Sequence, residues 1–280
     1  MKMWAVEISA GLVLAVASAG FGETVNMSLV SSPSVGLSQS LTITAKVGTS
    51  TAMLSSAGAY KWNVTSDTGS TFSSNIVNHT PLYTFCIQAF QTTGSSYNVA
   101  GLNTATPLGG PDGGAIDALA AAQIQGLVDK YWSALDFGKT KSTNYTFNSV
   151  AYTDDQVAAA FQLALWEIEY DGGAGGEKFG ATANYFSSGN LKAVRSGTAA
   201  RQLDGQAAIN LANGWLNNFT ADVAISSIAL VSGTRNDQFF GIPNAFSGAS
   251  VPTPLPMALP GALALIAGLG LHQKLRRRKN

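Results

Sequence analysis

Two side chains in this 280-residue sequence could take part in covalent chemistry, and both stand in apolar surroundings. Cys86 is the only cysteine and lies in a run of mostly apolar and aromatic residues, 83–87. Its thiolate would be a strong nucleophile, although a lone cysteine in an apolar strand is most often a small core residue. Gln162 is the only polar residue in the run 157–166 (VAAAFQLALW). A helix that is apolar all round is normally buried, so this carboxamide needs hydrogen-bond partners.

The hydrophobic pattern predicts the elements that position these two residues. Alternating or β-branched runs predict strands, and apolar residues at helical spacing predict helices. The strands are predicted at 40–47, 59–64, 82–87 and 221–231, and the helices at 115–137, 153–170 and 199–219. Thr153-Asp154-Asp155-Gln156 has the pattern of a capping box at the start of the middle helix. Strands at both ends with helices between them predict an α+β fold, a β-rich domain with a helical subdomain.

The N-terminus has the layout of a secretory signal peptide over residues 1–22. Lys2 precedes an apolar stretch at 8–17, and Ala17-Ser18-Ala19 provides small residues for cleavage. The alternative is an amphipathic first helix of the folded domain. The following residues, 23–245, contain no repeat and no long linker, which predicts a single domain.

The C-terminal segment, 246–280, consists of a linker, an apolar run at 255–271 and a basic end. At about 1.5 Å per residue, a helix over this run reaches about 25 Å, which is short for a permanent span of a ~30 Å hydrocarbon core. The basic end would stay cytoplasmic by the positive-inside rule. The segment therefore predicts a single transmembrane helix. This helix could be an ordinary membrane anchor or part of a sorting signal that is later removed.

This segment resembles the PEP-CTERM sorting signal of Gram-negative bacteria, which joins a Pro-x-Pro motif, a short transmembrane helix and an Arg-rich end. The matching positions are Val251, Pro252, Thr253 and Pro254, the run 257–271, and Arg276, Arg277, Arg278 and Lys279. Thr253 stands where the family usually has an acidic residue. The resemblance implies export, transient anchoring in the inner membrane, cleavage by an exosortase-type enzyme, and delivery to the cell surface or an exopolysaccharide matrix, as in biofilm adhesion.

The two apolar runs resemble the internal thioester domains of bacterial surface adhesins, whose signatures are an aromatic-Cys site and a Gln-x-Ala-Ile-Trp site. The matching residues are Phe85 and Cys86, followed by Phe161, Gln162, Ala164, Leu165 and Trp166. Leu165 replaces the usual Ile, and Phe161 replaces a frequent Thr. The resemblance implies a thioester that joins the Cys86 sulfur to the Gln162 acyl group with loss of ammonia.

The implied reaction is reasonable chemically. A primary amide is a poor electrophile, so the thiol must be held at near-attack distance, where effective molarities are very large. An amine-bearing target could then take the acyl group as an amide, which attaches the protein covalently. Each molecule would react once, so we predict a single-turnover attachment rather than an enzyme. The alternative is that Cys86 and Gln162 are only core residues of the same fold.

Composition and spacing argue against several other functions. Charged residues are only 11% of the chain, and the body between the two ends is mildly acidic, which excludes nucleic acid as an expected partner. No Cys/His spacing predicts a metal site, and no cofactor is expected. The runner-up is a noncovalent matrix or polysaccharide-binding module, with aromatics such as Tyr60, Trp62 or Tyr97 stacking on sugars. A third option, a Cys86–His79 hydrolase, would need an orienting third group, and the seven-residue spacing matches no cysteine-protease pattern.

Overall fold

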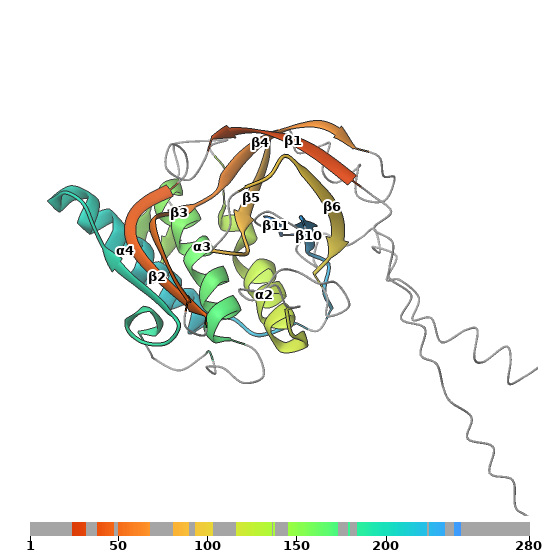
Figure 1. Cartoon of the computed structure of the whole chain (residues 1–280). Coiled ribbons are helices and arrows are strands. Elements are labelled where there is room, and N and C mark those ends of the chain that lie inside the picture. Colours follow the sequence, from red (N-terminus) through yellow and green to blue (C-terminus); the bar gives the residue numbers. More distant parts are fainter. Residues whose placement is uncertain are drawn as a thin grey trace, which may run out of the picture.

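The computed structural model describes residues 24–31, 38–47, 50–67, 81–89, 93–102, 116–135, 137, 145–172, 179, 184–222, 224–232 and 238–241. Within these ranges the chain combines strands with three α-helices (Figure 1). The prediction that helices and strands mix in this fold is confirmed. The predicted signal peptide, the whole C-terminal segment 246–280 and His79 lie outside the described residues.

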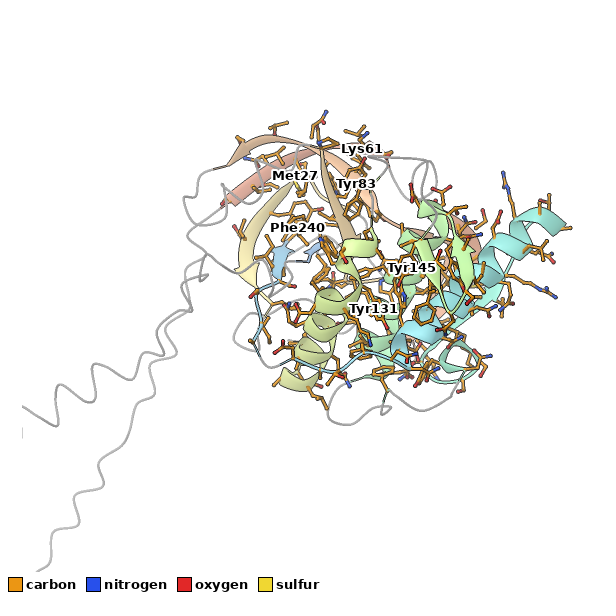
Figure 2. All side chains as sticks on the ribbon, turned by 180° about the vertical axis from the view of Figure 1, so that it is seen from behind. Met27, Lys61, Tyr83, Tyr131, Tyr145 and Phe240 are labelled. Carbon is orange, nitrogen blue, oxygen red and sulfur yellow. The ribbon has the colours of Figure 1, made fainter. Side chains whose placement is uncertain are left out.

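Six strands close into a barrel, and neighbouring strands run antiparallel. In order around the barrel they are β1 (Thr24–Ser31), β4 (Tyr60–Asp67), β5 (Leu82–Cys86), β11 (Gln238–Phe240), β10 (Ile228–Val231) and β6 (Ser96–Gly101). Alternate side chains fill the interior with an apolar cluster that includes Met27, Trp62, Leu82, Tyr97 and Phe240. Figure 2 shows Met27 and Phe240 within this half of the molecule. The barrel is thus a packed core.

Three helices pack beside the barrel: α2 (Ala118–Tyr131), α3 (Asp154–Asp171) and α4 (Ala199–Leu216). A second sheet has the strand order β3 (Ser50–Gly58), β2 (Ser38–Val47) and β9 (Leu191–Arg195). A hairpin joins β7 (Tyr145–Phe147) to β8 (Val150–Tyr152), and two 3₁₀ turns occupy Trp132–Ala134 and Tyr185–Ser187. The central helix, α3, contacts α2, α4 and the second sheet.

Helix α3 begins where the capping box predicts. The Thr153 hydroxyl accepts a hydrogen bond from the Gln156 backbone N–H, and the Gln156 side chain accepts one from the Thr153 N–H. The apolar run that follows is fully enclosed, since nearly every residue from Gln156 to Ile168 is buried. The burial expected from its composition is therefore confirmed. This helix holds Gln162 in the centre of the molecule.

Candidate functional site

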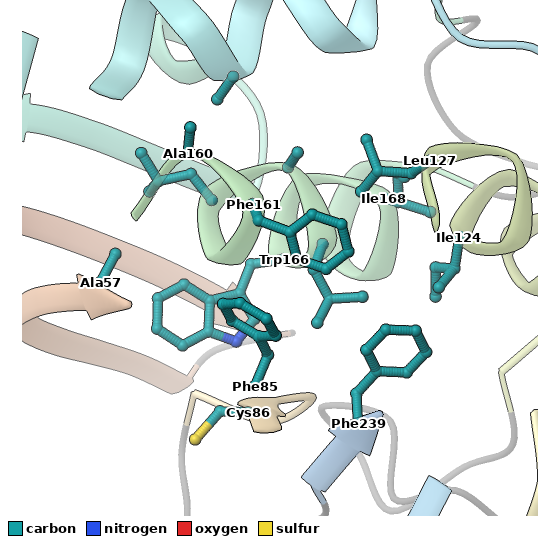
Figure 3. Close-up of a cluster of buried hydrophobic side chains, with 14 of the residues drawn as sticks. Ala57, Phe85, Cys86, Ile124, Leu127, Ala160, Phe161, Trp166, Ile168 and Phe239 are labelled. Carbon is teal, nitrogen blue, oxygen red and sulfur yellow. The ribbon is translucent and has the colours of Figure 1, made fainter. Parts of the chain in front are cut away.

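Cys86 is the last residue of β5 and is 2% exposed. Side chains alternate along a strand, so Leu82, Thr84 and Cys86 face one side and Phe85 faces the other. Leu82 belongs to the interior cluster of the barrel, whereas the ring of Phe85 lies 4.8 Å from that of Phe161 on α3. In Figure 3 the sulfur of Cys86 points away from Phe161. The thiol is therefore directed to the barrel side of β5, away from α3.

Gln162 reaches Cys86 from α3, but it contacts the backbone. The Cys86 N–H donates to Gln162 Oε1 at 2.9 Å, and Gln162 Nε2 donates to the Cys86 carbonyl at 2.8 Å. The pairing of β4 with β5 ends at Tyr60 and Thr84. Beyond that point, the Gln162 amide makes the two hydrogen bonds that a neighbouring strand would otherwise make with Cys86. The structure thus brings together the two residues predicted from the sequence and gives the Gln162 amide the partners that its burial requires.

Gln238 is the carboxamide that faces the thiol. It is directly opposite Cys86 in the register of β5 and β11, although 152 residues separate the two along the chain. Its Nε2 lies 3.5 Å from Cys86 Sγ, and the residue is fully buried. The N–H and C=O of a strand residue point to the same side, and those of Cys86 point to Gln162. Cys86 and Gln238 therefore form a non-hydrogen-bonded pair, the type in which opposing side chains are closest.

A chain of hydrogen bonds holds the other end of the Gln238 amide. The Trp62 indole N–H donates to Thr84 Oγ1 at 2.7 Å, and the Thr84 hydroxyl donates to Gln238 Oε1 at 2.7 Å. Trp62, Thr84 and Gln238 all have 0% exposure. The chain fixes the amide with its oxygen toward Thr84 and its nitrogen toward the sulfur of Cys86.

Tyr60 also contacts the thiol, because its hydroxyl is hydrogen-bonded to the Cys86 side chain. Burial raises the pKa of Tyr60 far above its ordinary value of 10.0, and the neighbouring Cys86 adds to the increase. A phenol with a raised pKa stays protonated at neutral and mildly alkaline pH. Tyr60 therefore acts as a hydrogen-bond donor beside Cys86 and not as a base.

The other residues predicted around the site form its apolar support. Phe85, Phe161, Ala164 and Leu165 are fully buried, and Trp166 is 4% exposed. Phe161 also packs on Phe239, with 6.4 Å between ring centres. This aromatic packing connects α3 to both β5 and β11, the two strands that carry Cys86 and Gln238. The residues predicted for sorting, 251–254 and 276–279, lie outside the described residues.

The aromatic residues considered for sugar stacking face the barrel interior. Trp62 has 0% and Tyr97 1% exposure, and Tyr60 is half-buried with its hydroxyl at Cys86. Packing and hydrogen bonding, not an exposed binding surface, account for their positions. In the described part of the chain, no cluster of three or more His, Cys, Asp or Glu side chains could hold a metal ion. None of the helices described there is long and apolar enough to cross a membrane.

The geometry of the site would allow one reaction, attack of the Cys86 thiol on the carboxamide carbon of Gln238. A buried thiol lies against a buried carboxamide whose oxygen already accepts a strong hydrogen bond, and two flanking aromatic side chains complete the hydrogen-bond network. Gln238 was not predicted from the sequence. Its local signal was a lone glutamine directly before two phenylalanines, in a strand of three residues.

Comparisons with family models, curated proteins and solved structures found no match to this chain.

Proposed function

We propose that this chain is an exported bacterial surface or matrix protein that forms an internal thioester at Cys86 and attaches covalently to amine-bearing targets. The observation that carries the proposal is the contact of 3.5 Å between Gln238 Nε2 and Cys86 Sγ inside the barrel. For this reason we assign the acyl group to Gln238. Gln162, which the sequence resemblance implies, is the alternative, and the variants described below distinguish the two.

Bond formation needs only the two side chains. The Cys86 sulfur attacks the amide carbon of Gln238, which is bonded directly to the nitrogen that touches the sulfur. The S–C bond forms, the C–N bond breaks, and the nitrogen leaves as ammonia with the proton of the thiol. The register of β5 and β11 provides the proximity, which can be worth several kcal/mol of the barrier.

The thioester would then be a protected acylating group. Both side chains are 2% exposed or less, so bulk water is excluded from the bond. A primary amine that enters the site takes the acyl group as an amide and releases the Cys86 thiol. The target then occupies the place of the lost ammonia on the Gln238 acyl group, and because the chain carries one such group, the protein acts once.

Intact-mass spectrometry of the purified body, residues 23–245, tests the proposal. We expect the mass to be lower than the sequence mass by one ammonia, and we expect no titratable thiol in the folded protein. Methylamine should add its own mass to the deficient species and release the thiol. The Cys86→Ala variant should have its full sequence mass and should not react with methylamine. An unmodified wild-type mass, with a thiol that titrates once the protein is unfolded, would refute the thioester.

We also propose that residues 246–280 act as a PEP-CTERM-like sorting signal, supported by the order of motif, apolar run and basic end in the sequence. Deleting residues 276–279 should leave the protein in the inner membrane or misdirect it, because the positive charges that hold the tail in the cytoplasm are lost. Fractionation of a Gram-negative host that has an exosortase measures this. Deletion of 246–280 gives the control that has no anchor. Unchanged delivery of the 276–279 deletion variant to the surface would argue against the sorting function.

A further inference from the structure

We propose that Thr84 is the oxyanion donor of this site: its hydroxyl holds the Gln238 carbonyl oxygen while the thioester forms and again while an amine opens it. The inference deepens the proposed function and rests on it. It starts from the bond of 2.7 Å between Thr84 Oγ1 and Gln238 Oε1.

The direction of this bond is determined by its neighbour. The indole N–H of Trp62 can only donate, and it occupies an acceptor position on Thr84 Oγ1 at 2.7 Å. The single hydroxyl proton of Thr84 is then free to point at Gln238 Oε1. Donation from Trp62 also polarises the hydroxyl, which makes it a stronger donor. Trp62 is thus a positioning residue that acts through Thr84.

The reaction places charge where this donor points. When the Cys86 sulfur bonds to the amide carbon, the π electrons of the carbonyl move onto Oε1, which becomes an oxyanion. When the C–N bond breaks and ammonia leaves, the oxygen returns to a carbonyl. In the later step an amine attacks the same carbon and Oε1 again takes the charge; the C–S bond then breaks, and the sulfur leaves with a proton of the amine as the Cys86 thiol. One donor therefore serves both steps.

Burial makes the donor effective. Thr84 and Gln238 have 0% exposure, and a fixed dipole in a dry site stabilises a developing charge far more than the same group would in water. Removal of one oxyanion donor from an enzyme typically slows the reaction by about 10²–10³-fold. The β4–β5 pairing supports the geometry, because Thr84 is directly opposite Tyr60, and the Trp62–Leu82 pair is two residues further along the two strands.

The test compares Thr84→Val with Thr84→Ser. Valine keeps the shape without the hydroxyl, and we expect it to slow both ammonia loss after refolding and methylamine opening by about 100-fold. Serine restores the donor, so both rates should return to within tenfold of wild type. The exposed Thr65→Val on β4 is the matched control and should leave both rates unchanged. Time-resolved intact-mass measurements give the two rates, and circular dichroism checks folding.

The role of Trp62 is tested by a double-mutant cycle. Trp62→Phe removes the N–H donor together with part of the buried indole ring system, and it should slow both steps roughly tenfold in the wild-type background, but not further in Thr84→Val. If Thr84→Val does not fold, loss of rate in a folded Trp62→Phe protein supports the donor, and an unchanged rate overturns it. If wild type loses ammonia and folded Thr84→Val loses it equally fast, the role of Thr84 is refuted while the proposed thioester still stands. If wild type never loses ammonia, the proposed function fails first.

Discussion

Replacing Gln238 with alanine should abolish the thioester completely. The acyl carbon is then missing from the position opposite Cys86, where Gln238 Nε2 lies 3.5 Å from the sulfur. We expect the Gln238→Ala protein to have its full sequence mass, to expose a titratable thiol on unfolding, and to be inert to methylamine. Intact-mass spectrometry with thiol titration before and after denaturation measures all three.

Two companion variants identify the acyl donor. Gln238→Asn keeps a carboxamide but shortens it by one methylene, which withdraws the carbon from the sulfur, so it should lose the bond as well. Gln162→Leu keeps both reacting groups, and the bond should still form, more slowly, because the Cys86 backbone is less well held. The opposite result, a full mass for Gln162→Leu and an ammonia deficit in Gln238→Ala, would assign the bond to Gln162.

The helices were predictable because their signals are local. The pattern of α3 includes its own start, and the structure begins the helix at Asp154 after the Thr153 cap. Predicted helices at 115–137 and 199–219 are shorter in the structure, Ala118–Tyr131 and Ala199–Leu216. Leu203, one of the apolar residues at helical spacing along α4, is 68% exposed. A repeat indicates a helix, but which of its members are buried depends on what packs against it.

One predicted strand was mostly wrong for a tertiary reason. Of residues 221–231, only Ile228–Val231 form a strand. The earlier part runs along α2, where Asp222 N–H donates to the Ala122 carbonyl and the Ser226 and Ser227 N–H groups donate to Gln125 Oε1. Close approach is possible because α2 has Gly126 beside Thr220, where a Cβ would collide with the Thr220 carbonyl oxygen. Strand-like composition could not reveal these partners.

The candidate site was predictable only in part. Composition and surroundings singled out Cys86 and Gln162, and the structure does bring them into contact. Which group meets the sulfur depends on strand register and on the face to which each side chain points. Gln238 faces Cys86 because β5 and β11 pair across 152 residues of sequence, and Thr84 joins the site because it shares a strand face with Cys86. No local pattern encodes that pairing.

Gln162 has a different and equally necessary task in this arrangement. Its amide satisfies both the N–H and the C=O of Cys86 at the end of β5, where β4 no longer pairs. It also connects α3 to the barrel through a residue that is 1% exposed. Buried backbone groups that lose their partners cost the full desolvation penalty, about 1–3 kcal/mol each. Leucine in place of Gln162 leaves two such groups, and water cannot reach them readily.

The Gln162→Leu substitution should therefore lower the free energy of unfolding by about 2–6 kcal/mol. The measurement is denaturant unfolding in a Cys86→Ala background, where no thioester contributes and the backbone of residue 86 is intact. Gln206→Leu on α4 is the matched control: its carboxamide donates to Asn210 Oδ1 in an exposed hydrogen bond, so the change should be within about 0.5 kcal/mol. A loss below about 1 kcal/mol for Gln162→Leu would mean that the Cys86 backbone finds other hydrogen-bond partners. The two bonds from Gln162 would then not explain why a glutamine occupies this apolar helix.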